Sequence, residues 1–422
     1  MIGAIADDFT GGSDVAVAFR RAGLRTAIQF GLHGSSLSVA ADVDALVIAL
    51  KTRAVPAREA VVQSITAARQ LRAAGADQLY FKYCSTFDST PQGNIGPVAD
   101  ALLDLTGGPA VVVPSSPEHG RTQYLGHLFV ADQLLSDSPL RNHPLTPMTD
   151  SRVPALLSGQ TDRAVMLVAH PVVTAGHRAV RDAIEAARHA DVPYIVIDAI
   201  DDDDLTTIGR ACQALPLLTG AAGLAGGWAR ARTGRGATPP LPEPDPVGPG
   251  PAAVLAGSCS TRTLEQLDQV LRDHPGHRLD ALTTPDPDDL AAAALQWYEQ
   301  QDPAMAPVIY SSQPVEELRR VQDVLGTARA SQILEGTLAR VSRGLVERNV
   351  RRLVVAGGES SGAVVRALGV TGGIIGAEVA PGVPWIYSTT ERGQPLALLL
   401  KSGNFGGPDL LDRAVTTCKE QP

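Results

Sequence analysis

The sequence predicts an α/β protein of two domains, each with a largely parallel β-sheet flanked by helices. Short apolar runs alternate with longer amphipathic stretches along the whole chain. The length of 422 residues exceeds that of one ordinary domain. Segment 237–251 contains seven prolines and no apolar periodicity, which is typical of an extended linker. We therefore expect a first domain over 1–236, a Pro-rich linker over 237–251 and a second domain over 252–422.

Each predicted element follows from its apolar pattern. In the first domain the expected strands are 2–6, 45–50, 79–82, 110–114, 164–169 and 194–198, with helices such as 57–74 and 176–190 between them. In the second domain the expected strands are 252–256, 307–310, 352–356 and 396–400, and the expected helices are about 261–273, 287–300, 329–348 and 360–368. Parallel sheets bind ligands beyond the carboxyl ends of their strands, so the polar loops after these strands are the candidate sites.

The composition excludes several classes of protein. A formal net charge of −9 argues against a nucleic-acid partner, because phosphate backbones need a basic surface. No apolar run approaches the roughly 20 residues needed to cross a membrane, and the first residues, MIGAIADDFTGG, lack the pattern of a signal peptide. The four cysteines lie far apart and suggest neither a disulfide framework nor a zinc site: Cys84, Cys212, Cys259 and Cys418. We expect a cytoplasmic protein without a membrane or nucleic-acid partner.

The first candidate loop, DDFTGGSD, follows strand 2–6 directly. Thr10 or Ser13 could cap the next helix, and a simple cap and turn would explain much of this loop. The adjacent carboxylates of Asp7 and Asp8 exceed what a cap needs. They therefore point to acid–base chemistry or to the binding of hydroxyl groups.

The second candidate loop is YFKYCSTFDSTPQGNIG, residues 80–96. Lys82, one of only four lysines, could hold a carboxylate, since lysine is a compact point charge. Hydroxyl, carboxyl and amide side chains follow it and could bind several substrate hydroxyls: Ser85, Thr86, Asp88, Ser89 and Asn94. A third polar loop after strand 110–114 carries Glu118, His119 and Arg121, and a fourth carries His170. Either histidine alone would more often be structural.

The second domain has loops of a different kind. Three strands lead into turns of small residues: Gly257–Thr261, Gly357–Ala363 and Lys401–Gly407. Small residues at a strand-to-helix turn leave backbone N–H groups free to face an anion. Three such turns with one lysine favour a site for a polyphosphate, although ordinary tight turns remain the alternative. The chain has neither GxxxxGK[ST] nor GxGxxG after its first strand, so a P-loop or a common dinucleotide fold is not indicated. A polar pocket in one domain with a phosphate site in the other is typical of a small-molecule kinase.

These loops resemble those of the four-carbon acid sugar kinase family. ADDFTGGSD at 6–14 is similar to the ADDLTGAND-like start of that family. KYCSTFDSTPQGNIGPVADALL from Lys82 replaces the usual KxDSTLRGN-like loop and looks like the 3-oxo-tetronate 4-kinase branch. PSSPEHGRTQYLGHLFV, NHPLTPMTDS, AGGESSGAVV and KSGNFG fit the same branch, so the resemblance covers nearly the whole chain.

The resemblance implies an N-terminal sugar-acid-binding domain, a C-terminal ATP-binding domain and an active site in the cleft between them. It implies ATP-dependent phosphorylation of the 4-hydroxyl of a 3-oxo-tetronate, with Mg²⁺ brought by the nucleotide and its protein ligands unassigned. ATP would contact Ser258, the turn Ser360-Ser361-Gly362-Ala363, and Gly403, and we add Gly357, Gly358, Lys401 and Asn404 from the same turns. The substrate would lie among Lys82, Ser85, Thr86, Asp88 and Arg121, with Asp8 as the base and Asp7 as its rival.

Two alternatives remain at this stage. A threonate or erythronate 4-kinase would use the same scaffold on a neighbouring acid, and a non-catalytic sugar-acid-binding regulatory protein would keep the fold without the chemistry. A nicotinamide-dependent dehydrogenase suits the strand–helix alternation but lacks the glycine fingerprint and its downstream acid. The expected partners are a small sugar acid and ATP, and a homo-oligomer is left open.

Overall fold

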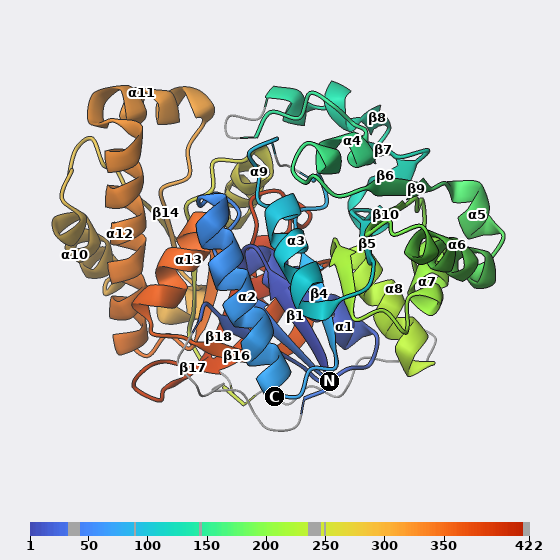
Figure 1. Ribbon diagram of the computed structural model, residues 1–422. Helices are drawn as coiled ribbons and strands as arrows, with labels where there is room; N and C mark the ends of the chain where they lie inside the picture. The colour runs from blue at the N-terminus through green and yellow to red at the C-terminus, as the bar shows by residue number, and fades with distance from the viewer. Residues whose placement is uncertain (33–42, 88–89, 143–145, 235–245, 249, 417–422) are drawn as a thin grey trace. The chain divides into compact units, whose positions relative to one another are not determined.

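The computed structural model describes residues 1–422 except 33–42, 88–89, 143–145, 235–245, 249 and 417–422. Within it the chain divides into two compact units, Met1–Leu241 and Pro242–Pro422. Most of the proline-rich segment, 237–245 and 249, lies outside the described residues. Each unit is an α/β structure with a mostly parallel sheet covered by helices, which confirms the predicted fold class (Figure 1). No helix of the described part is long and apolar enough to span a membrane.

The sheet of the first unit has the strand order β2-β3-β1-β4-β11-β5-β10-β9, and every neighbouring pair is parallel. Its strands are β1 (Ile2–Ala6), β2 (Thr26–Phe30), β3 (Ala45–Ala49), β4 (Gln78–Lys82), β5 (Ala110–Val113), β9 (Val165–Val168), β10 (Tyr194–Ile197) and β11 (Leu217–Gly220). The strands β1 to β4 are buried along their whole length, as expected when helices cover both faces of a sheet.

Helices of the first unit are α1 (Phe9–Arg21), α2 (Ala57–Ala73), α3 (Ile95–Thr106), α4 (Val153–Ser158), α5 (His170–Thr174), α6 (His177–His189), α7 (Asp202–Ala211) and α8 (Ala222–Thr233). Helix α1 packs beside α8, and α2 packs beside α3 (Figure 1). An aromatic cluster joins α1, β4 and α8, since Tyr80 stacks on Trp228 with ring centroids 6.1 Å apart and meets the edge of Phe19 at 6.3 Å. This cluster fixes the helices whose first turns line the carboxyl edge of the sheet.

A small antiparallel sheet stands apart from the main one. It consists of β6 (Arg121–Tyr124), β7 (His127–Val130) and β8 (Gln133–Leu134), and short 3₁₀ turns flank it at η1 (Pro117–His119), η2 (Leu135–Asp137) and η3 (Pro139–Asn142). The polar loop predicted after strand 110–114 therefore contains a strand of its own, which carries Arg121.

The sheet of the second unit has the order β13-β14-β12-β15-β18-β17-β16, parallel from β13 to β18 and antiparallel beyond. Its strands are β12 (Ala252–Ala256), β13 (Gly276–Arg278), β14 (Val308–Tyr310), β15 (Arg352–Ala356), β16 (Gly372–Ala380), β17 (Val383–Thr389) and β18 (Pro395–Lys401). Its helices are α9 (Thr261–Val270), α10 (Pro287–Tyr298), α11 (Val315–Leu325), α12 (Thr327–Glu347), α13 (Gly358–Ala367) and α14 (Leu410–Thr416), with a 3₁₀ turn η4 (Pro303–Met305). Leucines and valines of α9 and α14 pack on one face of this sheet.

The structure adds elements that the apolar pattern did not predict, among them β2, β11, β13, β16, β17, α11 and α14. Strand β2 contains Thr26 and Gln29, which are buried although polar. Strand β13 is only three residues long and its sequence, GHR, is not apolar. The register of β16 against β17 shifts between Ile375 and Glu378, so its side chains do not alternate regularly.

Candidate active site

Three strands of the first unit end side by side. Ala6 of β1 is in register with Ala49 of β3 and with Lys82 of β4. The loops that follow them are therefore neighbours, and the backbone N–H of Asp7 donates to the carbonyl of Lys82 at 3.1 Å. The predicted meeting of the DDFT loop with the Lys82 loop at one sheet edge follows from this register.

Asp7 forms an ion pair that the sequence did not reveal. Its two carboxylate oxygens accept hydrogen bonds from Arg53, at 2.9 Å from Nε and 2.7 Å from Nη2. Asp7 is 7% exposed, and burial raises the pKa of its carboxyl group although the Arg53 guanidinium acts in the opposite direction. This arrangement binds the loop after β1 to the loop after β3.

Asp8 is the N-cap of α1 and also faces two cations. Its Oδ1 accepts the Gly11 N–H at 2.7 Å, and its Oδ2 accepts the Thr10 hydroxyl at 3.0 Å and lies 3.1 Å from Arg53. Burial acts to raise the pKa of Asp8, but Arg53, Lys82 and these hydrogen bonds outweigh it and hold the pKa below its usual value. The two adjacent carboxyl groups therefore differ, since the pKa of Asp7 is raised and the pKa of Asp8 is lowered.

Lys82 is almost fully buried at the end of β4. Its ammonium donates to the carbonyl of Tyr83 at 3.0 Å and lies 3.6 Å from Asp14 of α1. A Cβ at position 11 would lie 3.3 Å from this ammonium and 2.3 Å from Asp8, so the site requires glycine there. Asp14 ends the motif ADDFTGGSD, but motif reasoning assigned it no role, and Arg53 lies outside every motif that was recognised.

The remainder of the loop after β4 is partly described. Thr86 is buried with its hydroxyl 2.8 Å from the Cys84 sulfur, and Ser85 is half-buried. Asp88, predicted as a substrate ligand, lies outside the described residues, as does Ser89. Asn94, predicted to bind hydroxyls, instead donates to backbone carbonyls of the loop after β3, at 2.6 Å from Thr52 and 2.9 Å from Val55.

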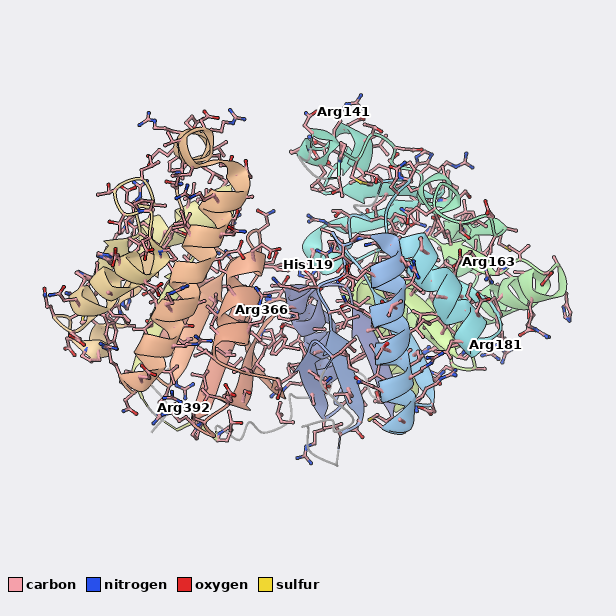
Figure 2. All side chains as sticks on the ribbon, turned by 60° about the vertical axis from the view of Figure 1, so that its left-hand side comes forward. His119, Arg141, Arg163, Arg181, Arg366 and Arg392 are labelled. Atoms are coloured by element: carbon pink, nitrogen blue, oxygen red, sulfur yellow. The ribbon has the colours of Figure 1, made fainter. Side chains whose placement is uncertain are left out.

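Arg121 reaches the same region from the small sheet. Burial lowers the pKa of its guanidinium, and Cys84 is close enough to act in the opposite direction. Its Nη1 donates to the carbonyl of His119, whereas its buried Nε has no hydrogen-bond partner within the described part of the chain. His119, which accepts this hydrogen bond and is labelled in Figure 2, ends the short 3₁₀ turn in the loop after β5. An unpartnered buried guanidinium N–H is a donor suited to a substrate carboxylate or hydroxyl.

A cavity of about 260 Å³ lies next to this edge, within the first unit. Asp14, the partner of Lys82, belongs to its wall, as does His119 of the loop that leads to Arg121. Its lining comes from α1, the loop after β5, the start of α7 and one side of α8: Asp14, Val17, Ala18, Arg21, Ser116, Pro117, Glu118, His119, Asp202, Ala222, Gly223, Gly226 and Arg230.

In the second unit the three predicted turns are also neighbours. Ala356 at the end of β15 is in register with Ala256 of β12 and with Lys401 of β18. Ser260 caps α9 and its hydroxyl donates to the carbonyl of Gly403 at 2.6 Å, so the turn after β12 is bonded to the turn after β18. All three turns predicted to bind a polyphosphate therefore stand at one sheet edge.

Glycines let these turns approach one another closely. A Cβ at Gly257 would lie 2.1 Å from the Ser360 hydroxyl, and a Cβ at Gly403 would lie 2.6 Å from the Ser258 hydroxyl. Gly357, which precedes α13, has a φ of 130°, a conformation that residues with a side chain avoid. Space around Gly358 is open, and Asn404 is exposed. The hydroxyl of Ser361 is buried without a partner among the described residues.

A fourth polar turn at this edge escaped the motif search. Ser311, Ser312 and Gln313 follow β14, which neighbours β12, and all three are buried. The hydroxyl of Ser312 has no partner in the described structure, and the Gln313 amide accepts from Arg278 at 2.9 Å. Their sequence, SSQP, carries no glycine, and glycine was the signal used to find the other three turns.

No group of three or more metal-ligating side chains converges within the described ranges. Lys82 and Lys401 are buried, whereas Arg141 and Arg181 of the first unit are exposed (Figure 2).

Comparison with known proteins covers both units. A family model described as a sugar-binding N-terminal domain matches residues 2–228, and one described as a nucleotide-binding C-terminal domain matches residues 253–411. Proteins named 3-oxo-tetronate kinase are similar over 98% of this chain and 96% of their own length. They include those of Burkholderia multivorans, at 44% identity, and Cupriavidus necator, at 45%.

Solved structures of similar proteins share the fold at 38% identity. A Haemophilus influenzae protein of the DUF1537 family matches with a TM-score of 0.81 over 99% of this chain and 100% of its own. A Salmonella typhimurium LT2 protein, described as a candidate tRNA synthase, matches with a TM-score of 0.87 over 98% of both chains.

Proposed function

We propose that this chain, which belongs to the family that joins a sugar-binding N-terminal domain to a nucleotide-binding C-terminal domain, is a 3-oxo-tetronate kinase. It transfers the γ-phosphoryl group of ATP to the 4-hydroxyl of a 3-oxo-tetronate and releases the 4-phosphate and ADP. The observation that carries this conclusion is the identity of 44–45% with 3-oxo-tetronate kinases over 98% of the chain. The net charge of −9 disfavours a tRNA-binding role.

The acid-binding role of the first unit is supported by its charges. A four-carbon acid is small and polar, so its site needs a cation and several hydrogen-bond partners. Lys82 and Arg121 would provide the cations, and Ser85, Thr86 and Asp88 would provide hydrogen bonds. The buried Nε of Arg121 supports this assignment, because a buried donor without a partner is costly unless a ligand satisfies it.

Asp8 is proposed as the base that accepts the proton of the 4-hydroxyl. Its carboxylate is 25% exposed, against 10% for Asp7, and its lowered pKa keeps it ionised at neutral pH. A weak base suffices in phosphoryl transfer, where positioning and charge neutralisation supply most of the catalysis. Asp7 remains the rival because of its raised pKa, although both of its oxygens already bind Arg53.

The nucleotide is proposed to lie on the turns of the second unit. Its phosphates would face the N-terminal turn of α13 and the turn after β18, where backbone N–H groups are available. The proposed contacts are Ser258, Gly357, Gly358, Ser360, Ser361, Gly362, Ala363, Gly403 and Asn404. Magnesium would enter with the nucleotide, held mainly by phosphate and water, as is common for this ion. That the two sites meet in an interdomain cleft stays a prediction, as do a homo-oligomeric state and a cytoplasmic location.

ADP release over a panel of four-carbon acids tests the function. We expect the protein to turn over a 3-oxo-tetronate with a kcat/KM at least about tenfold above those for threonate and erythronate, because a keto group and a hydroxyl differ in hydrogen bonding. Faster release with threonate or erythronate would reassign the substrate. No ADP release with any acid would favour a non-catalytic sugar-acid-binding protein.

The nucleotide placement is tested by Gly403→Ala. The new methyl group would meet the Ser258 hydroxyl, so we expect the Kd for ADP to rise about tenfold or more. Ser360→Ala, which removes a hydroxyl from the α13 turn, should weaken binding as well. Gly326→Ala is the control, because a Cβ at this position meets no atom within 4 Å. The backbone φ of 81° at Gly326 means that this variant loses some stability, but its Kd for ADP should not change. Calorimetric titration with ADP makes the comparison, and an unchanged Kd in both variants would contradict the placement.

A further inference from the structure

Lys401 has a setting unlike that of an ordinary phosphate-binding lysine. It is fully buried at the end of β18, and its ammonium has three acceptors. These are the Thr263 hydroxyl at 2.7 Å, the Gln266 amide oxygen at 2.6 Å and the Gly403 carbonyl at 2.9 Å. A lysine ammonium has three N–H donors, so protein atoms occupy all of them. The sequence suggested Lys401 as a nucleotide contact, but these bonds leave it no N–H for a ligand.

The three acceptors form one network that shapes the turn after β18. The Gly403 carbonyl accepts from Lys401, from Ser260 at 2.6 Å and from Thr263 at 3.0 Å. Gln266 also donates to the carbonyls of Phe405 and Gly407, at 3.0 and 2.8 Å. One face of α9 and Lys401 together therefore hold the backbone of 403–407.

Because the peptide bond is planar, this network also fixes the direction of the N–H group that follows Gly403. In a trans peptide the C=O and the following N–H point in opposite directions. Because the Gly403 carbonyl points inward to Lys401, the N–H of Asn404 points away from it. Asn404 is exposed, and its N–H makes no hydrogen bond in the part of the chain that the structure describes.

We propose that Lys401 is a positioning residue, whose ammonium holds the Gly403 carbonyl inward so that the Asn404 N–H faces the nucleotide phosphates. This proposal rests on the proposed function, and it gives Lys401 an indirect role in nucleotide binding. Thr263 and Gln266 share the task, because each is bonded both to the ammonium and to the turn.

The network predicts a dependence of nucleotide affinity on pH. Burial, assisted by Arg262 of α9, lowers the pKa of Lys401 to about 7. Arg262 is itself paired with Glu265 of α9 at 2.8 Å, and the groups that the ammonium contacts directly, on α9 and in the turn, are uncharged. Below that pKa the ammonium donates three hydrogen bonds. Above it the amine has two N–H groups and a lone pair, so one contact is lost and the turn loosens.

Nucleotide affinity is therefore expected to fall as the pH rises through about 7. The loss of one charge-assisted hydrogen bond amounts to about a tenfold rise in the Kd for ADP. By linkage, the anionic nucleotide favours the protonated lysine, so binding takes up a proton near the pKa.

The test is a calorimetric titration of the full-length protein with ADP between about pH 6 and about pH 9. Lys401→Met should bind ADP about tenfold more weakly than the wild type at low pH, and its pH profile should show only the titration of ADP itself. Proton uptake, measured in buffers of different ionisation enthalpy, should be smaller in the variant than in the wild type.

A matched pair at Thr263 keeps the proposal testable if Lys401→Met does not fold. Thr263→Val keeps the shape of the side chain but removes the hydroxyl, and it should raise the Kd for ADP. Thr263→Ser keeps the hydroxyl and should retain wild-type affinity and pH dependence. The KM for ATP should rise in the valine variant while the KM for the acid stays constant.

The outcomes separate this proposal from the function on which it rests. Wild-type affinity and pH dependence in both Lys401→Met and Thr263→Val would overturn the positioning role. A reduced active fraction with an unchanged Kd would do the same, because it would indicate a purely structural role. A wild-type protein that binds no ADP at any pH would instead overturn the proposed function.

Discussion

Asp8→Asn is expected to lower kcat by about 10²–10⁴-fold, the usual contribution of a general base, while ADP binding persists. Asparagine cannot accept the proton of the 4-hydroxyl, although it fills nearly the same volume. Because asparagine is also a strong N-cap residue, it can keep the hydrogen bond to the Gly11 N–H that starts α1. The measurement is steady-state ADP release with saturating substrates, beside a thermal melt that checks the fold.

Asp7→Asn provides the comparison for this experiment. It removes the negative charge and one of the two acceptors for Arg53, so it should disturb the loop after β3 and raise mainly the KM for the acid. If Asp7→Asn abolishes turnover and Asp8→Asn is nearly normal, Asp7 takes over the role of base.

Lys82→Met is expected to destabilise the first unit by about 3–5 kcal/mol, because it leaves the Asp14 carboxylate buried without its cation. The side chains are 4% and 9% exposed, so solvent cannot compensate for the loss. Removal of the ammonium should also abolish acid binding at accessible concentrations. Urea unfolding measures the first effect and acid-dependent ADP release the second.

The double variant Lys82→Met/Asp14→Leu separates stability from function. Replacing both members of a buried ion pair by apolar residues is often neutral, so most of the lost stability should return. Acid binding should not return, because the cation is still missing. Recovery of acid-dependent activity in the double variant would show that Lys82 acts only through the fold.

The sequence predicted the edges at which the sites lie better than the contacts within them. Asp7, Asp8 and Lys82 follow apolar runs directly, so a parallel sheet was enough to place them at one edge. Arg53 stands in a loop without a motif, and its pairing with Asp7 depends on β3 lying next to β1, which the apolar pattern does not specify. The same holds for the turn after β14, which becomes a neighbour of Ser258 only through the strand order.

Lys401 illustrates a second limit of sequence reasoning. Its place among glycines and serines suggested a direct contact with phosphate. A lysine in an open turn and a lysine folded back under it have the same local sequence, and only the side chains of α9 distinguish them. Burial of a charge is a property of the assembled unit.

The burial of Lys82 and Lys401 also has a practical consequence for handling the protein. Amine-reactive dyes, biotinylation reagents and resin linkers modify exposed lysines, and this chain has only four lysines in all. Lys82 is 3% exposed and Lys401 is 0% exposed, so neither presents an amine to such a reagent. The remaining lysine that the structure describes is Lys51, which is half-buried and lies over the ring of Phe9, with its ammonium 5.8 Å from the ring centroid. Coupling through Lys51 would instead modify the loop that holds Arg53 beside Asp7 and Asp8, so it should impair the proposed acid site and spare the proposed nucleotide site.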